Sequence, residues 1–214
     1  MVNFAIIVNF VFLSFYDSTH TQSILPDSEY IIYETNDKGK IGMIEVILKK
    51  DTVGYNVIYK SDRIVEAILD TINLQTLYLN KIIKGRWELS VKKNHLFEVN
   101  YQGRKNHYNE KNPVYDRHTL DFVLRGFQYQ RDFKQRIRLN VPEFMIINAD
   151  LEVIGEDIIS VPAGTFDCWK IMMIPRVVFT KMKFYFYIEK SYPHRFVKYT
   201  DSSGKNSIIL KEYR

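Results

Sequence analysis

Short apolar segments separated by polar turns recur along most of the chain, at intervals of roughly ten residues. Residues 29–35, 41–50 and 55–60 are three such segments, and the first turn contains Gly39, which can adopt a positive φ. Segments of this length and spacing are typical of antiparallel sheets. No linker rich in Gly, Pro or Ser divides them. We therefore predict a mainly β single domain over residues 22–214, built as an antiparallel open barrel or a curved, rolled sheet.

One stretch, residues 117–126, has the period of a helix instead. Its apolar residues recur at i, i+3, i+4 and i+7, the spacing of one helical face: Leu120, Val123, Leu124 and Phe127. Asp116 is suited to cap the start of this short helix, and Gly126 to end it. The preceding residues 103–116 are polar and have no period, so we predict a long loop there.

The chain begins with a different pattern, a 12-residue apolar run over residues 4–15 followed by polar residues. The run is too short to span a membrane, which takes about 20 apolar residues. It resembles the apolar core of a secretory signal peptide, with cleavage possible before Gln22, although no Lys or Arg precedes it. We predict a signal peptide over residues 1–21, a periplasmic or secreted protein, and a mature chain without a transmembrane span. A buried N-terminal strand or helix is the alternative.

Composition adds three constraints. The single cysteine, Cys168, excludes an intramolecular disulfide and makes a zinc cluster improbable. The 15 Tyr, 14 Phe and 2 Trp favour half-buried strands. The net charge of +5 would permit an anionic partner, but the basic residues are scattered. The densest group, between Arg125 and Arg138, is interrupted by Asp132 and two aromatic residues, which predicts a solvated strand face and no nucleic-acid partner.

Two phrases stand out near the C-terminus. In the first, residues 159–171, Pro162 ends a strand and Gly164 closes a tight hairpin, so that Pro162, Gly164, Thr165 and Phe166 form a structural motif. Strict alternation would then place Phe166, Cys168 and Lys170 on one face, opposite Asp167, Trp169 and Ile171. Cys168 is predicted to be a small core residue, since nothing nearby indicates a reactive thiolate.

In the second phrase, residues 191–199, Pro193 forces an extended kink and His194 and Arg195 begin a new strand. We predict that His194 is a hydrogen-bonded corner residue, with a role as a general base as the weaker alternative. Between the two phrases Lys183, Tyr185 and Tyr187 alternate with Phe184, Phe186 and Ile188, which indicates one wetter and one dry face. If the wetter face is concave, a ligand would contact Trp169, Tyr185 and Tyr187, with His194 and Arg195 as further candidates.

These phrases, the aromatic strand between them and the helical segment together resemble the domain-of-unknown-function 3108 family of bacterial envelope proteins, most clearly over about residues 116–213. The resemblance implies an exported, mainly antiparallel β protein, and it supplies no catalytic residues. By analogy it also suggests the open half-barrels of lipoprotein carriers of the LolA and LolB type.

The chain lacks a nucleophile elbow, a phosphate-binding glycine loop and a zinc-protease motif, and its five histidines lack metal-ligand spacing. We therefore predict no cofactor, no metal and no catalytic residues. The first hypothesis is a non-catalytic binding module for a lipid or other hydrophobic ligand. The second is an envelope protein that contacts another protein or an anionic glycan, and the third is a hydrolase using His194. A dry cavity of several hundred Å³ would favour the first hypothesis.

Overall fold

The computed structural model describes residues 24–142, 145–177 and 182–214. Within these ranges the chain forms fifteen strands, one 3₁₀ turn and one short α-helix. The strands are β1 (Ser28–Asp37), β2 (Lys40–Lys50), β3 (Tyr55–Lys60), β4 (Arg63–Leu69), β5 (Thr76–Ile83), β6 (Arg86–Lys93), β7 (Phe97–Tyr101), β8 (Arg104–Tyr108), β9 (Val114–Asp116), β10 (Lys134–Val141), β11 (Met145–Val161), β12 (Gly164–Pro175), β13 (Phe184–Glu189), β14 (Phe196–Asp201) and β15 (Asn206–Tyr213). The predicted signal peptide lies outside the described residues.

All fifteen strands belong to one sheet, in which the first and last strands of the chain meet in the middle. Strands β1 to β8 form one antiparallel run, strands β10 to β15 form a second, and antiparallel pairing of β1 with β15 joins the two. The short strand β9 pairs in parallel with β10 and forms one edge, while β8 forms the other. The predicted mainly β fold with a curved, open sheet is therefore confirmed.

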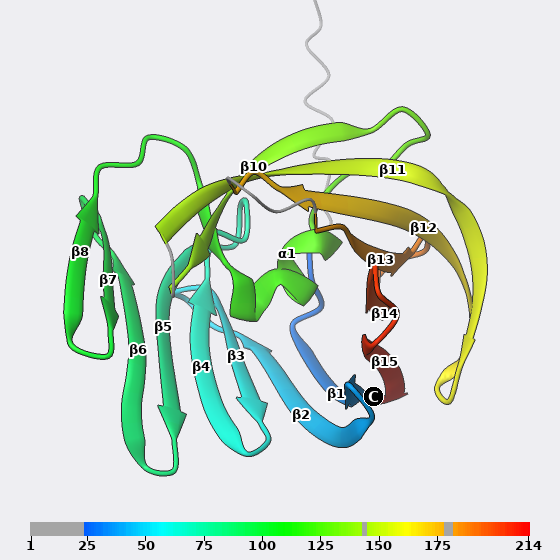
Figure 1. Cartoon of the computed structure of the whole chain (residues 1–214), viewed down its shortest axis with the longest axis horizontal. Coiled ribbons are helices and arrows are strands. Elements are labelled where there is room, and N and C mark those ends of the chain that lie inside the picture. Colours follow the sequence, from blue (N-terminus) through cyan, green and yellow to red (C-terminus); the bar gives the residue numbers. More distant parts are fainter. Residues whose placement is uncertain (1–23, 143–144, 178–181) are drawn as a thin grey trace, which may run out of the picture.

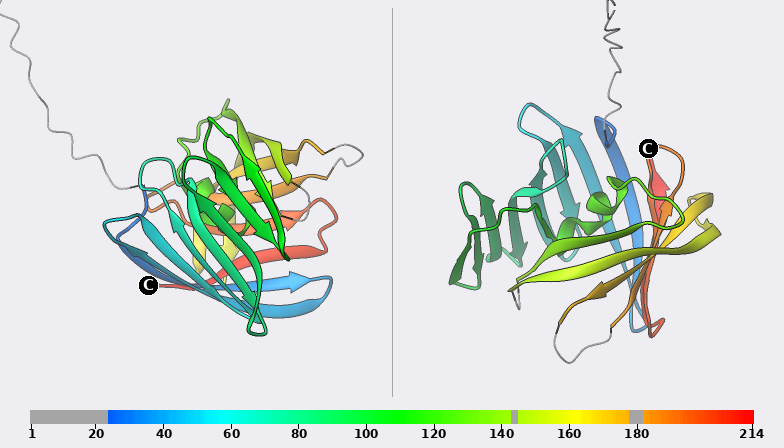
Figure 2. Two further views of the ribbon diagram at one scale, coloured as in Figure 1. Left: turned by 90° about the vertical axis from the view of Figure 1, so that its left-hand side faces the viewer. Right: turned by 90° about the horizontal axis from the view of Figure 1, so that it is seen from above.

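The two runs curl toward each other, so that β10 to β12 arch over the strands at the start of the chain (Figure 1). The 3₁₀ turn η1 (Arg117–Thr119) and helix α1 (Leu120–Arg125) lie in the space between them, as both views in Figure 2 also show. The predicted helix is confirmed. An Asp116 carboxylate oxygen caps η1 by accepting a hydrogen bond from the backbone N–H of His118 at 2.9 Å, and Gly126 follows the last residue of α1.

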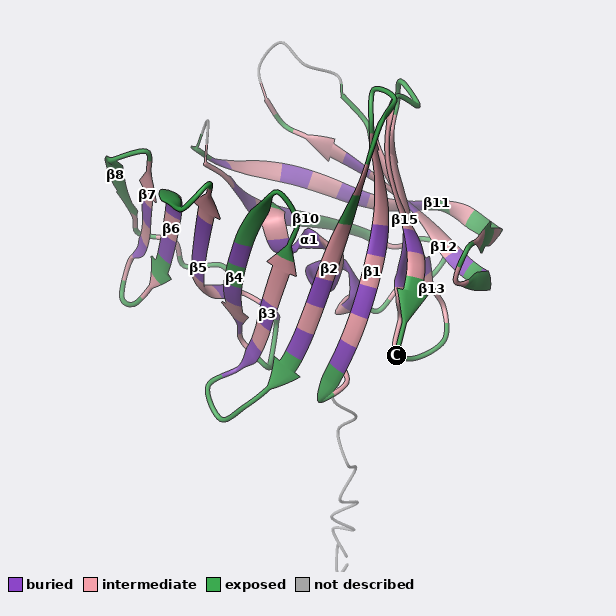
Figure 3. Cartoon of the chain, turned by 90° about the horizontal axis from the view of Figure 1, so that it is seen from below, coloured by how far each residue is buried: buried purple, intermediate pink, exposed green. Residues whose placement is uncertain are grey.

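Burial alternates along the central strands, which Figure 3 shows as bands on β1 and β2. The inward residues form two apolar clusters. The larger cluster packs the β1 to β3 region, α1 and β10 to β15 together, and the smaller one fills the β4 to β7 region under Val114 and Ile146. Helix α1 contributes three fully or almost fully buried apolar residues to the larger cluster: Phe122, Val123 and Leu124. The helix therefore fills part of the space between the two runs of strands and packs against both.

The predicted long loop over residues 103–116 is only partly a loop. Arg104–Tyr108 is an edge strand, β8, paired with β7, and Val114–Asp116 is β9. Four of the five β8 residues are exposed, so the strand shows no apolar alternation that a sequence pattern could reveal. Polar and charged side chains of this kind are common on edge strands, where they discourage pairing with other chains.

The basic segment between Arg125 and Arg138 is a solvated strand face only in part. Arg131, Lys134 and Arg136 form ion pairs at 2.8 Å with acidic residues of β11, namely Glu156, Glu152 and Asp150 respectively. Arg125 contradicts the prediction, because its side chain is 1% exposed and pairs with Glu29 at 2.7 Å. The helical segments that the structure describes are too short to cross a membrane.

Candidate functional site

A cavity of about 560 Å³ lies between the two runs of strands, beside η1 and α1. Its wall is mainly apolar and draws on nine strands, on η1 and α1, and on the segment between β12 and β13. The lining residues are Tyr33, Ile44, Tyr59, Arg117, His118, Leu120, Asp121, Leu139, Val141, Ile147, Met173, Pro175, Val177, Met182, Phe184, Phe186, Phe196, Tyr199 and Ile208. Pockets for small ligands have volumes of about 300–1,000 Å³ and mostly apolar walls, so this cavity has the dimensions of a ligand site.

Strand pairing explains why aromatic residues gather on this wall. Phe186 of β13 is directly opposite Tyr199 of β14, which is directly opposite Ile208 of β15, so the three share one face of the sheet. The rings of Phe186 and Tyr199 are 5.4 Å apart, and those of Tyr33 and Phe196 are 5.6 Å apart. The wall is therefore a packed aromatic surface rather than a set of separate rings.

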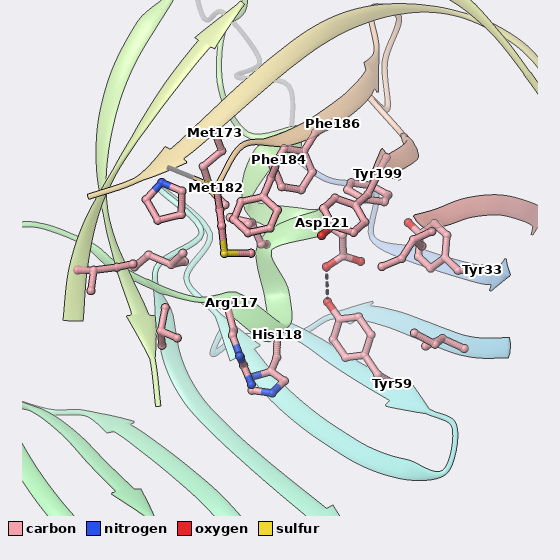
Figure 4. A pocket seen from close by; sticks show the side chains of 18 of the residues that line it. Tyr33, Tyr59, Arg117, His118, Asp121, Met173, Met182, Phe184, Phe186 and Tyr199 are labelled. Carbon is pink, nitrogen blue, oxygen red and sulfur yellow. Dashed lines mark hydrogen bonds between the residues drawn. The ribbon is translucent and has the colours of Figure 1, made fainter. Parts of the chain in front are cut away.

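Asp121, in the first turn of α1, brings a carboxyl group to this wall. One of its oxygens, Oδ1, accepts a hydrogen bond of 2.6 Å from the Tyr59 hydroxyl, drawn as a dashed line in Figure 4. The other, Oδ2, is buried and has no hydrogen-bond partner among the described residues. Burial raises the pKa of Asp121 to about 6, although the Tyr59 hydrogen bond and the charge of Arg125 act in the opposite direction.

The neighbouring tyrosines respond to the same environment. Burial raises the pKa of Tyr33 and of Tyr59 well above the usual value, and the negative charge of Asp121 adds to the effect at both residues. Both phenols therefore stay protonated at physiological pH and can donate hydrogen bonds toward Asp121 or a ligand. This end of the cavity is therefore one polar part of a mainly apolar wall.

His118 and Arg117, on η1, form a second polar part of the wall. The His118 ring nitrogen Nδ1 is 2.7 Å from Oδ1 of the buried Asp116, whose Oδ2 accepts a hydrogen bond of 2.6 Å from the Asn140 amide. Burial acts to raise the pKa of Asp116, but the charge and hydrogen bonds of His118, with the Asn140 amide, leave this pKa below its usual value. Asp116 thus fixes the orientation of the His118 ring.

A carboxylate that orients a histidine is one component of many hydrolytic sites, which also need a nucleophile. Among the described residues that line the cavity there is no Ser, Thr or Cys. Cys168, the only cysteine, is fully buried in the core as predicted, and burial raises the pKa of its thiol to about 12. The described part of the wall thus combines a histidine, oriented by a carboxylate, with mainly apolar side chains.

The structure places Trp169, Tyr185 and Tyr187 away from the cavity, although Phe184 and Phe186 of the same strand line it. The Lys170 and Lys198 ammonium groups each lie 5.6 Å from the Tyr187 ring, and the Lys190 ammonium lies 5.0 Å from the Trp169 ring. These aromatic residues belong to the lysine-rich outer face of β12 to β14. The concave face is therefore the dry one and not the wetter one.

Strict alternation fails beside two irregularities of the sheet. The pairing of β11 with β12 skips Ile154 of β11, and across from it Ile171 of β12 is buried together with Phe166 and Cys168 instead of opposite to them. The pairing of β13 with β14 skips Val197 of β14, and across from it the consecutive residues Tyr187 and Ile188 are both buried. A bulge places two residues of one strand opposite one residue of its partner and increases the local twist.

His194 and Arg195 form part of the corner between β13 and β14 rather than the cavity wall. The His194 ring lies 3.2 Å from the backbone carbonyl oxygen of Glu189, and the Arg195 guanidinium forms an ion pair at 2.9 Å with the Glu189 side chain. The corner follows a cis peptide bond between Tyr192 and Pro193. His194 is therefore a hydrogen-bonded corner residue, as predicted, and this placement gives no support to it as a general base. The prediction that His194 and Arg195 begin the next strand is wrong, because His194 has a positive φ of 57° and β14 begins at Phe196.

The first phrase is a hairpin, as expected. Strand β11 ends at Val161, Pro162 and Ala163 make the turn, and Gly164 pairs with Val161 at a positive φ of 139°. The Thr165 hydroxyl lies 3.0 Å from the Ser160 hydroxyl across the hairpin, and Phe166 is buried. These residues shape the end of the β11 to β12 arch and do not line the cavity.

Comparisons with known proteins add little to this description. No family model and no curated protein matches the chain. A solved structure of a candidate exported protein with a YmcC-like fold from Bacteroides fragilis is 12% identical, with 89% of this chain and 97% of that one covered and a TM-score of 0.37. A candidate lipoprotein from Parabacteroides distasonis is 14% identical, with 90% and 98% covered and a TM-score of 0.35. Likenesses this distant do not extend the properties of those proteins to this chain, and the family resemblance seen in the sequence stays a prediction.

Proposed function

We propose that the protein is an exported, non-catalytic binding module that holds a hydrophobic small molecule or lipid in the cavity between its two runs of strands. The observation that carries this proposal is the apolar cavity of about 560 Å³. A volume of this size bordered by aromatic and Met side chains would not stay filled with water at low cost, since its walls offer water few hydrogen bonds. The signal-like residues 4–15 support export to the periplasm or the medium.

The test is native mass spectrometry of the full chain produced in a bacterial host, followed by solvent extraction of any added mass. Export predicts a protein cleaved near Gln22, and binding predicts an added mass in a fixed ratio that extracts as a hydrophobic compound. A wild-type protein without added mass that also fails to bind an apolar fluorescent dye would contradict the binding proposal.

Two neighbouring isoleucines on β15 provide a matched pair of variants. Ile208 lines the cavity, whereas Ile209 is next in sequence and pairs with Lys198 and Glu34 on the outer face. Ile208→Trp places an indole in the ligand space and should abolish the added mass, while Ile209→Trp should leave it unchanged. Equal retention by two folded variants would show that the compound binds elsewhere.

A second candidate function is contact with an anionic glycan or an envelope protein through the outer face of β12 to β14. It is favoured by the lysine ammonium groups beside Trp169 and Tyr187. Retention on an anionic glycan resin at low salt, lost in the double variant Lys170→Glu/Lys198→Glu, would support it. Unchanged retention in that variant would argue against it.

A further inference from the structure

Asp121 supplies the only carboxyl group among the described residues that line the cavity. It receives one side-chain hydrogen bond, from Tyr59, and the backbone N–H groups of Asp121 and Phe122 favour its charged form, but its Oδ2 atom is buried without a hydrogen-bond partner among the described residues. A carboxylate in an apolar setting is costly unless a positive charge or further hydrogen bonds compensate it. The wall of this ligand-sized cavity therefore carries a carboxylate whose energetic cost must be compensated by some other group.

The nearest cation does not supply the compensation in full. Arg125 lies one helical turn from Asp121, but its guanidinium pairs with Glu29 at 2.7 Å and donates to the Pro193 carbonyl oxygen at 3.1 Å and 3.2 Å. Arg195 lies 3.9 Å from the same glutamate and pairs with Glu189 at 2.9 Å. The positive charges of these two arginines are matched by the negative charges of the two glutamates. The negative charge of Asp121 therefore has no matching positive charge within this group.

The other basic groups of the wall are Arg117 and His118, on η1. Figure 4 shows them side by side below Asp121, whereas Tyr33, Tyr59 and Tyr199 lie toward its right. The His118 ring is already bound to Asp116. The positive charge of a bound ligand would therefore find in Asp121 a carboxylate that the wall neutralises only in part.

The rings near Asp121 suit such a cation. Tyr33, Tyr59 and Tyr199 line the cavity together with Phe186 and Phe196. Aromatic faces attract ammonium groups, most strongly where water is excluded. A carboxylate among aromatic rings is an arrangement that binds organic ammonium groups, and it has no comparable attraction for a carboxylate or phosphate.

We propose that the ligand is an organic cation, an amine or quaternary ammonium group attached to an apolar chain, whose positive charge contacts Asp121 and the surrounding rings. The proposal rests on the proposed binding function and names the chemical class of its ligand. The apolar chain would extend away from Asp121 along Met173, Ile147 and Val141, which line the same cavity.

Three probes with the same 12-carbon chain test the proposal: dodecyltrimethylammonium, dodecanol and dodecanoate. Their dissociation constants would be measured by titration calorimetry at pH 8, below the concentrations at which they form micelles, on the delipidated protein. We expect dodecyltrimethylammonium to bind at least about tenfold more tightly than dodecanol, because its charge is attracted to the Asp121 carboxylate and to the aromatic faces in a site that excludes water. Dodecanoate should bind most weakly.

Asp121→Asn keeps an oxygen for the Tyr59 hydrogen bond and removes the charge. Because the charge–charge attraction is lost, it should weaken binding of the ammonium probe about 10- to 100-fold and change dodecanol binding less than about threefold. Asp167→Asn, at an exposed position on the outer face, is the matched control and should change neither. If Asp121→Asn does not fold, the relative affinities of the three probes for the wild-type protein still test the proposal.

The possible outcomes separate the two proposals. Equal or tighter binding of dodecanol or dodecanoate in the wild-type protein would overturn the assignment of an organic cation and leave the binding function standing. Equal ammonium affinity in the wild type and Asp121→Asn would also overturn it. Failure of all three probes to bind would reject the binding function and the inference that rests on it.

Discussion

The buried ion pair between Arg125 and Glu29 offers a direct test of how the fold is held together. The Arg125 and Glu29 side chains are 1% and 5% exposed, and their closest charged atoms are 2.7 Å apart. Arg125→Met would leave Glu29 as a buried carboxylate without its main partner, and the Pro193 carbonyl oxygen would lose two hydrogen bonds. Removing one member of a buried pair typically costs about 3–5 kcal/mol of unfolding free energy.

Arg131 provides the control because its distance to a carboxylate is almost the same. It lies 2.8 Å from Glu156, but its side chain is 87% exposed. Arg131→Met should therefore cost less than about 1 kcal/mol. In a chain of this length, 1 kcal/mol shifts the melting temperature by about 2–4 °C, so Arg125→Met should melt roughly 6–20 °C below the wild type.

The assay is urea unfolding followed by far-ultraviolet circular dichroism, with thermal melting as a second measurement. The double variant Arg125→Met/Glu29→Leu completes the experiment, since replacing both members of a buried pair by apolar side chains is often close to neutral. It should recover most of the loss of Arg125→Met. If Arg125→Met cost no more than Arg131→Met, the reasoning from burial would be refuted.

Two further predictions concern Asp121 and the glycines. Burial raises the pKa of Asp121 from 3.8 to about 6, so the folded state binds this proton more tightly than the unfolded state, and ionisation destabilises the fold as pH rises from about 4 to 6. Asp121→Asn should therefore be about 1–3 kcal/mol more stable than the wild type at pH 8 and should lose that advantage at pH 4. Urea unfolding at both pH values measures the difference, and an equal difference at pH 8 and pH 4 would contradict this prediction. A Cβ atom at Gly54 would lie 2.2 Å from the Leu69 carbonyl oxygen, whereas one at Gly155 would have nothing within 4 Å. Gly54→Ala should accordingly lower the unfolding free energy by about 1–3 kcal/mol, and Gly155→Ala should lower it by less than about 0.5 kcal/mol. Equal effects of the two substitutions in urea unfolding would show that the backbone moves to relieve the close approach at Gly54.

Local patterns in the sequence were sufficient for most of the elements and turns of this fold. The hairpin at Pro162 and Gly164, the start of η1 at Asp116 and the end of α1 before Gly126 all follow from residue types that favour one backbone conformation. The strand β8 did not follow from any pattern, because an edge strand exposed on both sides has no need of alternating apolar residues.

The site depended on information that the local pattern does not contain. The pattern of β13 distinguishes its two faces, but which face is concave depends on the pairing of β1 with β15 and on the curl of the whole sheet. No pattern in the sequence pointed to Asp121, and Arg125 was predicted to lie on a solvated strand face, since both residue types are usually exposed. Their partners, Tyr59 and Glu29, are 62 and 96 residues away in the sequence, and only the folded chain brings them together.

The ion pair and the candidate site are linked through helix α1. Six residues are too few for a helix that is stable by itself, so tertiary contacts must hold α1 in place. At its start Asp116 attaches η1 to β10 through Asn140, and at its end Arg125 attaches α1 to β1 and to the corner at Pro193. The helix is thereby fixed at both ends across the space between the two runs of strands, and it fills only part of that space. Asp121 lies between the two attachments, which is why a carboxylate can be held at a defined place on an otherwise apolar wall.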